Sequence, residues 1–355
     1  MGVALVGCSD EPVEPKPSVE LAWISKGRCN SFFDIGRFGV RLAGQDLAAG
    51  GEADVHVELL EPDDCEGAAA PPPAPEGCET AAAQMATVEE AIAKPVDALA
   101  ISVSNPTCLT PLLDRAVDQG IKVLTFDSDA PDSRRQVFYG MDNRAAGRLI
   151  ARSLAGLLGG SGKVAIQTSM SKDAAGAYHL STSTSYVERM AGIEEGLAEH
   201  PELTLSAVVP CIGNDVLDPA CATELEALLE DDPEISGLLL ARGKVLREAD
   251  LAEHAPELTE GIEAGRLHAV AMDAPDDALA NIRAGYAEFV IAQKQFGWGY
   301  DVMTLAYDML MHGAEPPAFY DSGFYVVCPN NVDAYERMWE GHDFRDELEP
   351  CETLE

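Results

Sequence analysis

Two carboxylates follow the end of a predicted strand, and their position is the most informative feature of this chain. Val123 to Phe126 is an apolar, β-rich run that stops at Asp127 and Asp129, with Pro131 just beyond. A helical pattern over 111–119, closed by Gly120, precedes the run, as in the αβ half of a βαβ unit. Ligands of open α/β sheets bind at the carboxyl ends of strands. The pattern therefore predicts that these carboxylates bind or react with something polar.

Other predicted strands also end in polar side chains. A polar residue that follows a single strand is commonly a helix N-cap or a loop hydrogen-bonding group. That alternative weakens when the same placement recurs along the chain, as it does at Asn30, Asp127, Asp129, Arg242, Asp273 and Gln293. We therefore expect these side chains to meet in one cleft.

Strand and helix patterns alternate along the chain, which indicates parallel sheets covered by helices. About five βα units precede residue 140 and about five follow it, so we expect two doubly wound lobes with ligand between them. The strands are expected at 21–25, 55–60, 98–103, 121–126, 163–168, 203–209, 235–240, 267–272 and 287–292. The helices are expected at 33–48, 79–93, 111–119, 143–158, 186–199, 221–230, 244–253, 278–284 and 300–311.

Composition and motifs exclude several functions. The 355 residues carry 61 acids against 24 bases, a formal charge of −37, which would repel a phosphate backbone and argues against nucleic-acid binding. No GxSxG, GxxxxGK[ST] or HExxH motif occurs, and the seven histidines form no ligand-spaced pair. We therefore expect no enzyme activity, no cofactor and no metal.

The N-terminus resembles a bacterial lipoprotein signal. Leu5-Val6-Gly7-Cys8 is similar to a lipobox, whose cysteine is lipidated, and residues 9–18 have the proline-rich acidic composition of a tether. The apolar stretch before Cys8 is short and lacks a basic start, so an arbitrary apolar beginning is the alternative. We expect lipidation at Cys8 and attachment to a bacterial membrane.

Cysteine number points to an oxidising compartment. Without Cys8, eight cysteines remain, an even number that suits four disulfides. Many connectivities are open. Proximity to loops and strand ends favours Cys29–Cys108, Cys65–Cys78, Cys211–Cys221 and Cys328–Cys351. A zinc site is the alternative, but the chain has no CxxC pair.

Seven segments in order resemble the sugar-binding family of periplasmic substrate-binding proteins, the ribose- and galactose-binding type. The resemblance covers roughly residues 19–340. It rests on Asn30-Ser31-Phe32-Phe33, Gly120 to Asp129, Tyr139 to Asn143 with Gly147, Glu188 to Ile193, Ala271-Met272-Asp273, Ile291-Ala292-Gln293 with Gly299-Tyr300, and Val326-Val327 with Asn331-Val332-Asp333.

This resemblance implies two doubly wound parallel-sheet lobes of the periplasmic binding protein type I fold, joined by a hinge of three crossings near 140, 294 and 323. Residues 1–18 would be lipobox and tether, 19–140 plus 294–322 lobe one, and 141–293 plus 323–355 lobe two. It also implies a monomer that closes on a sugar-like ligand and delivers it to an ABC permease, in the periplasm or at the cell surface.

The resemblance further assigns ligand contacts to Asn30, Phe32, Phe33, Asp127, Asp273 and Gln293. One of the two phenylalanines is as readily explained by core packing, and Asp129 by a turn before Pro131. Where relatives carry an amide after 238–240, this chain has Arg242, whose planar guanidinium suits carboxylates or several hydroxyls.

A second departure concerns the helix near 186, which begins Tyr186-Val187-Glu188 where relatives often have a ligand-binding arginine. We therefore expect an acidic sugar, a polyol or another oxygen-rich ligand, unless Arg242 pairs with a neighbouring acid.

Two other functions would use the same two-lobed architecture. A regulator of the lactose-repressor type shares the lobes but needs a basic helix-turn-helix at its start, which this chain lacks. A protein that presents ligand to a chemoreceptor or sensor kinase uses the same lobes, and this function remains an open alternative.

The Ser/Thr-rich segment 169–185 is expected to be a surface loop, with a place on the cleft rim as the alternative.

Overall fold

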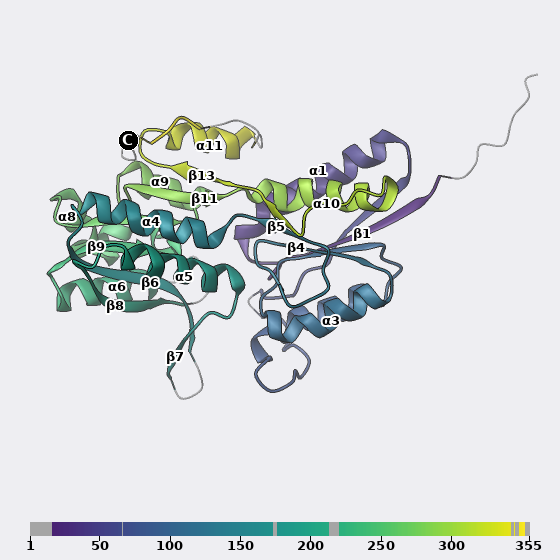
Figure 1. Cartoon of the computed structure of the whole chain (residues 1–355), viewed down its shortest axis with the longest axis horizontal. Helices are drawn as coiled ribbons and strands as arrows, with labels where there is room; N and C mark the ends of the chain where they lie inside the picture. The colour runs from purple at the N-terminus through teal and green to yellow at the C-terminus, as the bar shows by residue number, and fades with distance from the viewer. Residues whose placement is uncertain are drawn as a thin grey trace, which may run out of the picture.

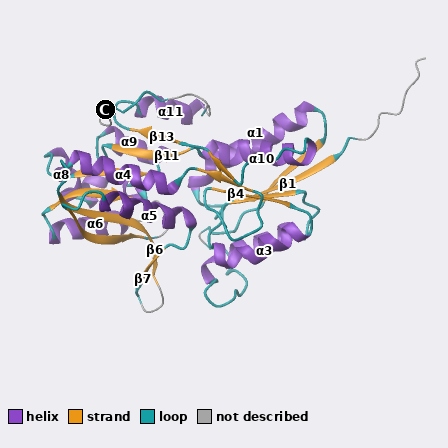
Figure 2. Ribbon diagram, in the orientation of Figure 1, coloured by secondary structure: helices purple, strands orange, loops and turns teal. Residues whose placement is uncertain are grey.

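The computed structural model describes residues 16–65, 67–172, 176–212, 220–341, 344 and 348–351. Cys8 and most of the expected tether lie outside these residues. Figure 1 shows two α/β lobes side by side, and Figure 2 shows that each has a central sheet covered by helices. Among the described residues, no helix combines the length and apolar character that a membrane crossing requires.

The first sheet has six strands in the order β12-β5-β4-β3-β1-β2, and all of its pairings are parallel. These strands are β1 (Ser18–Ile24), β2 (Asp54–Leu59), β3 (Ala98–Ile101), β4 (Lys122–Phe126), β5 (Val137–Gly140) and β12 (Phe319–Asp321). The helices of this lobe are α1 (Asp34–Gly50), α2 (Ala82–Ile92), α3 (Pro106–Asp118) and α10 (Gln295–Met311).

The second sheet has seven strands in the order β13-β11-β10-β9-β6-β7, with β8 also paired to β6. These are β6 (Gly162–Lys172), β7 (Tyr178–Leu180), β8 (Leu203–Cys211), β9 (Ile235–Leu240), β10 (His268–Met272), β11 (Phe289–Gln293) and β13 (Phe324–Val327). The helices are α4 (Asn143–Leu157), α5 (Thr184–Ala198), α6 (Ala220–Asp231), α7 (Leu251–His254), α8 (Pro256–Glu263), α9 (Leu279–Arg283) and α11 (Val332–Gly341). β7 and β13 pair antiparallel with β6 and β11, so this sheet is mixed rather than wholly parallel.

The chain passes between the sheets three times: after β5, between β11 and α10, and between β12 and β13. β5, β12 and β13 are short strands that the sequence analysis did not assign. Their alternation is too brief to separate them from loops, and each is defined by its neighbour in the sheet.

Helix packing in both lobes depends on glycines. A β-carbon at Gly299 of α10 would collide with the backbone of Gly36 in α1, and one at Gly192 of α5 with the backbone of Arg144 in α4. The missing side chains allow the helix backbones to touch. The α4–α5 contact fixes the position of the α5 residues that reach the cleft.

One predicted helix differs from the structure. Residues 244–253 were expected to form a single helix, but a 3-10 turn, η3 (Gly243–Arg247), is followed by α7 and then by α8. Pro256 stands at the first position of α8, where its fixed φ favours a helix start and its ring disfavours continuation from the preceding residue. The 3-10 turn holds Arg242 and Lys244 at the carboxyl edge of the sheet.

The structure has four disulfides, and two of the predicted pairings are wrong. Cys29 pairs with Cys65 and Cys78 with Cys108, in place of Cys29–Cys108 and Cys65–Cys78. The long loop after β2 does not close on itself. Its first end is joined to the loop after β1, and its second end to the start of α3. Cys211–Cys221 and Cys328–Cys351 are paired as expected.

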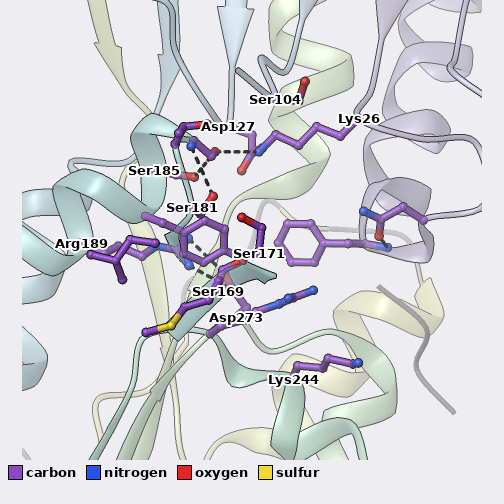
Figure 3. A pocket seen from close by; sticks show the side chains of 18 of the residues that line it. Lys26, Ser104, Asp127, Ser169, Ser171, Ser181, Ser185, Arg189, Lys244 and Asp273 are labelled. Carbon is purple, nitrogen blue, oxygen red and sulfur yellow. Dashed lines mark hydrogen bonds and ion pairs between the residues drawn. The ribbon is translucent and has the colours of Figure 1, made fainter. Parts of the chain in front are cut away.

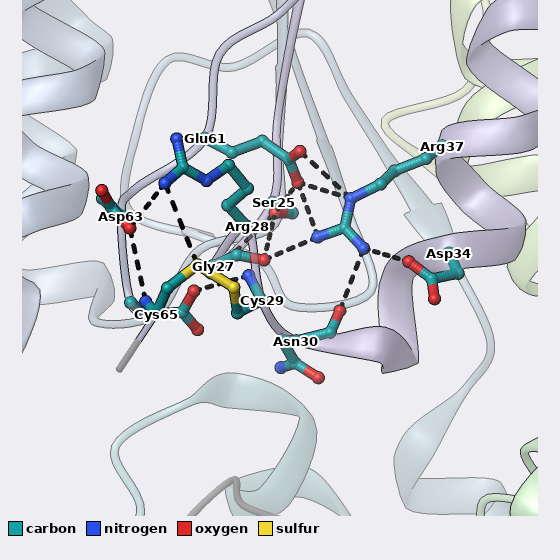
Figure 4. The surroundings of a disulfide bond; sticks show 11 residues. Ser25, Gly27, Arg28, Cys29, Asn30, Asp34, Arg37, Glu61, Asp63 and Cys65 are labelled. Atoms are coloured by element: carbon teal, nitrogen blue, oxygen red, sulfur yellow. Dashed lines mark hydrogen bonds and ion pairs between the residues drawn. A yellow bond between two sulfur atoms is a disulfide. The ribbon is translucent and has the colours of Figure 1, made fainter. Parts of the chain in front are cut away.

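Polar contacts around the first disulfide explain this connection (Figure 4). The backbone N–H of Cys29 donates to Asp64 (2.7 Å), and Arg28 pairs with Asp63 (2.8 Å). The buried guanidinium of Arg37 donates to Glu61 and to the carbonyl of Asn30. The start of the loop is therefore fixed against the segment that carries Asn30.

Candidate functional site

A cavity of about 970 Å³ lies between the lobes, at the carboxyl ends of the strands of both sheets (Figure 3). Its walls include Asn30, Phe32, Phe33, Asp127, Arg242, Asp273 and Gln293. Seven of the eight predicted ligand residues, from five separate stretches of chain, therefore line one space. Their meeting follows from the parallel sheets, because the carboxyl ends of parallel strands share one edge.

Asp127 forms the lobe-one wall at the end of β4. Its carboxylate pairs with Lys26 (2.8 Å) and accepts a hydrogen bond from Ser102 (2.6 Å), and the residue is only 3% exposed. Its φ of 58° is in the left-handed region, which aspartate tolerates better than most residues. The strained turn holds the carboxylate at the strand end instead of letting it point to solvent.

Asp273 occupies the equivalent position in lobe two, at the end of β10. It also has a positive φ, 72°, and its carboxylate accepts two hydrogen bonds from Arg189, at 2.9 and 3.2 Å. Gln293 donates to the same carboxylate through Nε2 (2.8 Å). Two adjacent strand ends thus share one polar network.

Arg189 is 1% exposed and comes from α5. Burial alone would lower the pKa of its guanidinium, but the charge and hydrogen bonds of Asp273, together with the nearby Tyr186 and Asp127, raise that pKa. The side chain also donates to Asn143 (2.8 Å) and to the carbonyl of Ala241 (3.1 Å). A fixed cation therefore lines the lobe-two wall.

The inference that this helix contributes no arginine to the cleft is therefore wrong. Arg189 shares the buried face of α5 with Ser185, Gly192 and Gly196, at helical spacing. The sequence signal for a buried Arg189 was an arginine on an otherwise small or apolar helix face. A charged side chain is rarely buried unless it pairs with an opposite charge.

Asn30 and the two phenylalanines lie on one turn of lobe one. Asn30 caps η1 (Ser31–Phe33), its side chain accepting from the N–H of Phe32 (3.2 Å). Phe32 is partly exposed. Phe33 is 1% exposed and packs against Trp23, Phe126 and Trp298, so its main contribution is to the core.

Arg242 lines the cavity from the loop after β9. Its guanidinium donates to the carbonyl of Cys211 (3.0 Å), and the ammonium of Lys244 donates to the carbonyl of Ile212 (3.1 Å). Both side chains are anchored beside the Cys211–Cys221 disulfide, and both line the cavity. Two cationic side chains therefore lie on this wall in a chain of net charge −37.

Asp129 is not part of the cavity wall, and the expectation of a ligand contact is corrected. Its carboxylate pairs with Arg135 (2.5 Å) and accepts from Thr125 (2.6 Å) and from the N–H of Ala130 (2.8 Å). All three partners belong to lobe one. The Asp129 carboxylate is therefore used within that lobe, which agrees with the alternative that it stabilises the turn before Pro131.

Two parts of the site were missed. Lys26 follows β1, lines the cavity and connects the lobes, donating to Ser183 (3.2 Å) as well as pairing with Asp127. The segment expected to be a surface loop is a hairpin of β6 and β7 followed by the start of α5. Its residues 169–171, 179–183 and 185 line the cavity. The segment has only Lys172 and Asp173 as charged residues at neutral pH, and this low charge in a chain of net charge −37 was the available signal.

The lobes touch directly where β4 ends. The hydroxyls of Ser128 and Ser183 are 2.6 Å apart, and the N–H of Asp129 donates to Thr184 (2.7 Å). Thr184 in turn donates to the carbonyl of Asp129 (3.1 Å). The first turn of α5 is thereby joined to the lobe-one wall.

Comparison with known proteins agrees with this geometry. Residues 68–315 match the family described as "Periplasmic binding protein domain". No curated protein sequence shows a significant match.

Solved structures resemble the whole chain. An ABC transporter solute-binding protein from Burkholderia graminis, in complex with D-arabinose, has 25% identity and a TM-score of 0.70, covering 91% of this chain and 99% of that one. A sugar-binding protein of a sugar ABC transporter from Bacillus halodurans has 27% identity and a TM-score of 0.67, covering 89% and 99%. The fructose-binding periplasmic domain of a hybrid two-component system has 19% identity and a TM-score of 0.68, covering 91% and 95%.

The expected type I architecture, two α/β lobes with a polar cleft between them, is therefore confirmed. The family match spans more than half of the chain and includes Asp127, Arg189, Asp273 and Gln293. This chain belongs to the periplasmic binding protein family.

Proposed function

We propose that this protein captures a sugar or sugar-like polar ligand in the cleft between its lobes. Carboxylates, amides and a guanidinium converge there from both sheets, and such groups match hydroxyls that both donate and accept. Phe32 and Tyr186 add aromatic rings, which suit the C–H faces of a sugar ring. Two similar solute-binding proteins support this proposal, one solved with D-arabinose and one named as sugar-binding.

Gln293 provides the observation that carries the proposal. The residue is 5% exposed and lines the cavity, and its Nε2 donates a hydrogen bond to the carboxylate of Asp273. Its Oε1 has no hydrogen-bond partner among the described residues. An unsatisfied buried acceptor costs about 1–3 kcal/mol, so a ligand hydroxyl that donates to it would be bound favourably.

Binding is proposed to close the hinge. Contacts that both lobes make to one ligand exist only when the lobes are together, so ligand shifts the population toward the closed state. The proposal assigns residues 19–140 plus 294–322 to one moving body and 141–293 plus 323–355 to the other.

Delivery and location complete the proposal. Cys8 would carry the lipid, residues 1–18 would act as anchor and tether, and an ABC permease would accept the ligand from a monomeric binding protein. The four disulfides support an oxidising compartment, the periplasm or the cell surface.

A ligand-presenting sensor is the second candidate, because a similar fold occurs as the periplasmic domain of a two-component system. Co-purification with a permease from membranes would favour transport, and co-purification with a histidine kinase or chemoreceptor would favour sensing.

Thermal-shift screening with sugars, sugar acids and polyols tests the proposed capture. A ligand at about 100 times its dissociation constant adds about 2.7 kcal/mol of stability, a rise of several degrees in melting temperature. Titration calorimetry should then give Gln293→Leu about fivefold weaker binding or more, since a lost hydrogen bond is worth about 1 kcal/mol or more.

Gln45→Ala, at an exposed position of α1, is the control and should bind like wild type. A screen in which no compound raises the melting temperature would count against sugar capture. So would unchanged affinity of Gln293→Leu for the ligand that the screen finds.

A further inference from the structure

The cavity is larger than one sugar ring requires. Its volume of about 970 Å³ is at the upper end of the roughly 300–1,000 Å³ typical of small-molecule pockets. A single pyranose with its hydroxyls would fill only a fraction of this space. The question is therefore what the remaining space is built to hold.

Contacts between the lobes bound the cavity on two flanks. Asp129 and Thr184 are joined on one flank, and on the other the guanidinium of Arg247 donates to Ser31 (3.0 Å). Arg247 is itself held by a bidentate pair with Asp277. The volume therefore belongs to lobes that already touch.

Two groups of residues line different parts of the cavity. Asp127, Asp273 and Gln293 stand at strand ends, and Arg189 reaches them from α5; we call this group the inner subsite. The other group comes from structures that extend past the strand ends, and we call it the outer rim. It consists of residues 77, 79–80 and 104–105 of lobe one and residues 170–171 and 179–181 of lobe two.

The β6–β7 hairpin sets the depth of the outer rim. Gln167 of β6 pairs with Leu240 at the end of β9, and β6 continues for five more residues. At about 3.3 Å per residue, the hairpin extends the wall by roughly 16 Å. Figure 1 shows it projecting beyond the second lobe, on the side where α3 of the first lobe lies.

The outer rim differs from the inner subsite in chemistry. Besides Glu79 and His179, it presents hydroxyls on Thr80, Ser104, Ser171 and Ser181, and an apolar side chain on Leu180 that is 52% exposed. Figure 3 shows serines of both lobes around the pocket. Small hydroxyls, one exposed carboxylate and an apolar contact suit a hydroxyl-rich unit, whose hydroxyl groups both donate and accept hydrogen bonds.

Disulfides hold the lobe-one part of the rim in place. Cys78 is next to Gly77 and Glu79, and its bond to Cys108 joins this turn to the start of α3, beside Ser104 and Asn105. Cys29–Cys65 holds the other end of the same loop. A loop fastened at both ends contributes contacts at a lower entropic cost than a mobile loop.

We infer that the outer rim is a second subsite, so that the preferred ligand is an oligosaccharide of two or more units. One unit occupies the inner subsite, and the next lies between the Cys78 turn and the β6–β7 hairpin. This inference rests on the proposed capture of sugars and specifies the size of the ligand.

Calorimetry with homologous series tests the inference, using xylose, xylobiose and xylotriose, glucose with maltose and cellobiose, and arabinose with arabinobiose. At least one series should show the disaccharide or trisaccharide binding about tenfold or more tighter than its monosaccharide. A monosaccharide that binds as tightly as its oligomers overturns the second subsite and leaves sugar capture standing. Binding of no saccharide of either length overturns both.

Matched variants locate the second unit. Leu180→Ala should lower the ratio of oligosaccharide to monosaccharide affinity about threefold or more, because it removes an apolar contact only at the rim. Leu205→Ala is the control, since Leu205 of β8 is similarly exposed (45%) and does not line the cavity. An unchanged ratio in Leu180→Ala overturns the assignment of the rim.

Paired cysteine variants test the fastened loop. Cys78→Ser with Cys108→Ser should lower the same ratio, whereas Cys328→Ser with Cys351→Ser, which removes a disulfide far along the chain, should not. Melting temperatures of both double variants show that each is folded at the assay temperature. If both double variants show the same ratio of oligosaccharide to monosaccharide affinity, the Cys78 turn does not contribute to the second subsite.

Discussion

Asp127 and Asp273 occupy equivalent positions in the two lobes and have the same unusual backbone. Each follows the third strand of its sheet counted from the hinge edge, β4 or β10, and each has a positive φ, 58° or 72°. Each carboxylate pairs with a cation, Lys26 or Arg189. Because strained backbone persists only where the surroundings hold it, the paired geometry supports the proposal that both strand ends contact the ligand.

The Asp273–Arg189 pair makes a prediction about stability. Asp273→Ala should destabilise the fold by about 3–5 kcal/mol, because Arg189 would keep a buried charge without its partner. Asp273→Asn should cost less, since asparagine tolerates the positive φ and still accepts a hydrogen bond. Urea unfolding measures both, with the exposed Asp132→Ala as control. Equal stability of Asp273→Ala and the control would contradict the prediction.

The hydrogen bonds of Thr184 between the lobes lead to a prediction about the closed state. Thr184→Val keeps the shape but removes both hydrogen bonds to Asp129. We expect a larger radius of gyration without ligand and a few-fold weaker affinity, because closure then carries a greater free-energy cost. Small-angle scattering with and without the ligand found by screening checks this. An unliganded radius identical to that of wild type would argue against a role for Thr184 in closure.

The position of Arg242 in the cavity wall leads to a prediction about ligand affinity. If its guanidinium contacts ligand, Arg242→Ala should lose about 10- to 100-fold in affinity, since charged hydrogen bonds contribute about 1.5–3 kcal/mol. Arg242→Lys should recover little, because an ammonium lacks the planar fork. Arg266→Ala, an exposed arginine outside the cavity, is the control in the same calorimetric series. Unchanged affinity of Arg242→Ala would remove Arg242 from the site.

Glu195 predicts a dependence of stability on pH. Hydrogen bonds from Arg144 and Arg148 lower the pKa of Glu195 from 4.5 to about 2. A lowered pKa in the folded state stabilises the protein above pH 4.5, and the contribution disappears as pH falls toward 2. Glu195→Gln should therefore melt slightly lower than wild type at pH 7, by a few degrees at most, and the difference should shrink at pH 3.

The neighbouring Glu194→Gln, exposed on the same helix, is the control for that experiment. High salt should also reduce the Glu195→Gln difference, because exposed charges are screened. A difference that is constant from pH 7 to pH 3 would rule out the ion pairs as its source.

Much of the fold could be predicted because its signals are local. Buried strands such as β4 and β10 are apolar runs, α1 and α4 show helical spacing, and polar residues follow the strands directly. Parallel sheets then bring those residues to one edge, whatever the details of packing. Seven of the eight predicted ligand residues line the cavity for this reason.

The predictions that were wrong concern partners far apart in sequence. Asp129 and Asp127 look alike in sequence, yet Arg135 holds the first and Lys26 the second. The Cys65 and Cys78 pairings depend on how the loop after β2 lies against α3. Nothing in the local sequence around any of these residues specifies its partner.

The sequence by itself determined the two-lobed α/β architecture and the ring of polar strand ends, since both follow from short-range periodicity. Only the tertiary structure decided that the buried face of α5 turns Arg189 toward the cleft, that Asp129 lies outside the cleft, and how four of the cysteines pair. Those outcomes depend on how closely α4 and α5 approach and on which loop reaches which helix. Distances between remote segments are set by packing of the whole molecule, and no local pattern encodes them.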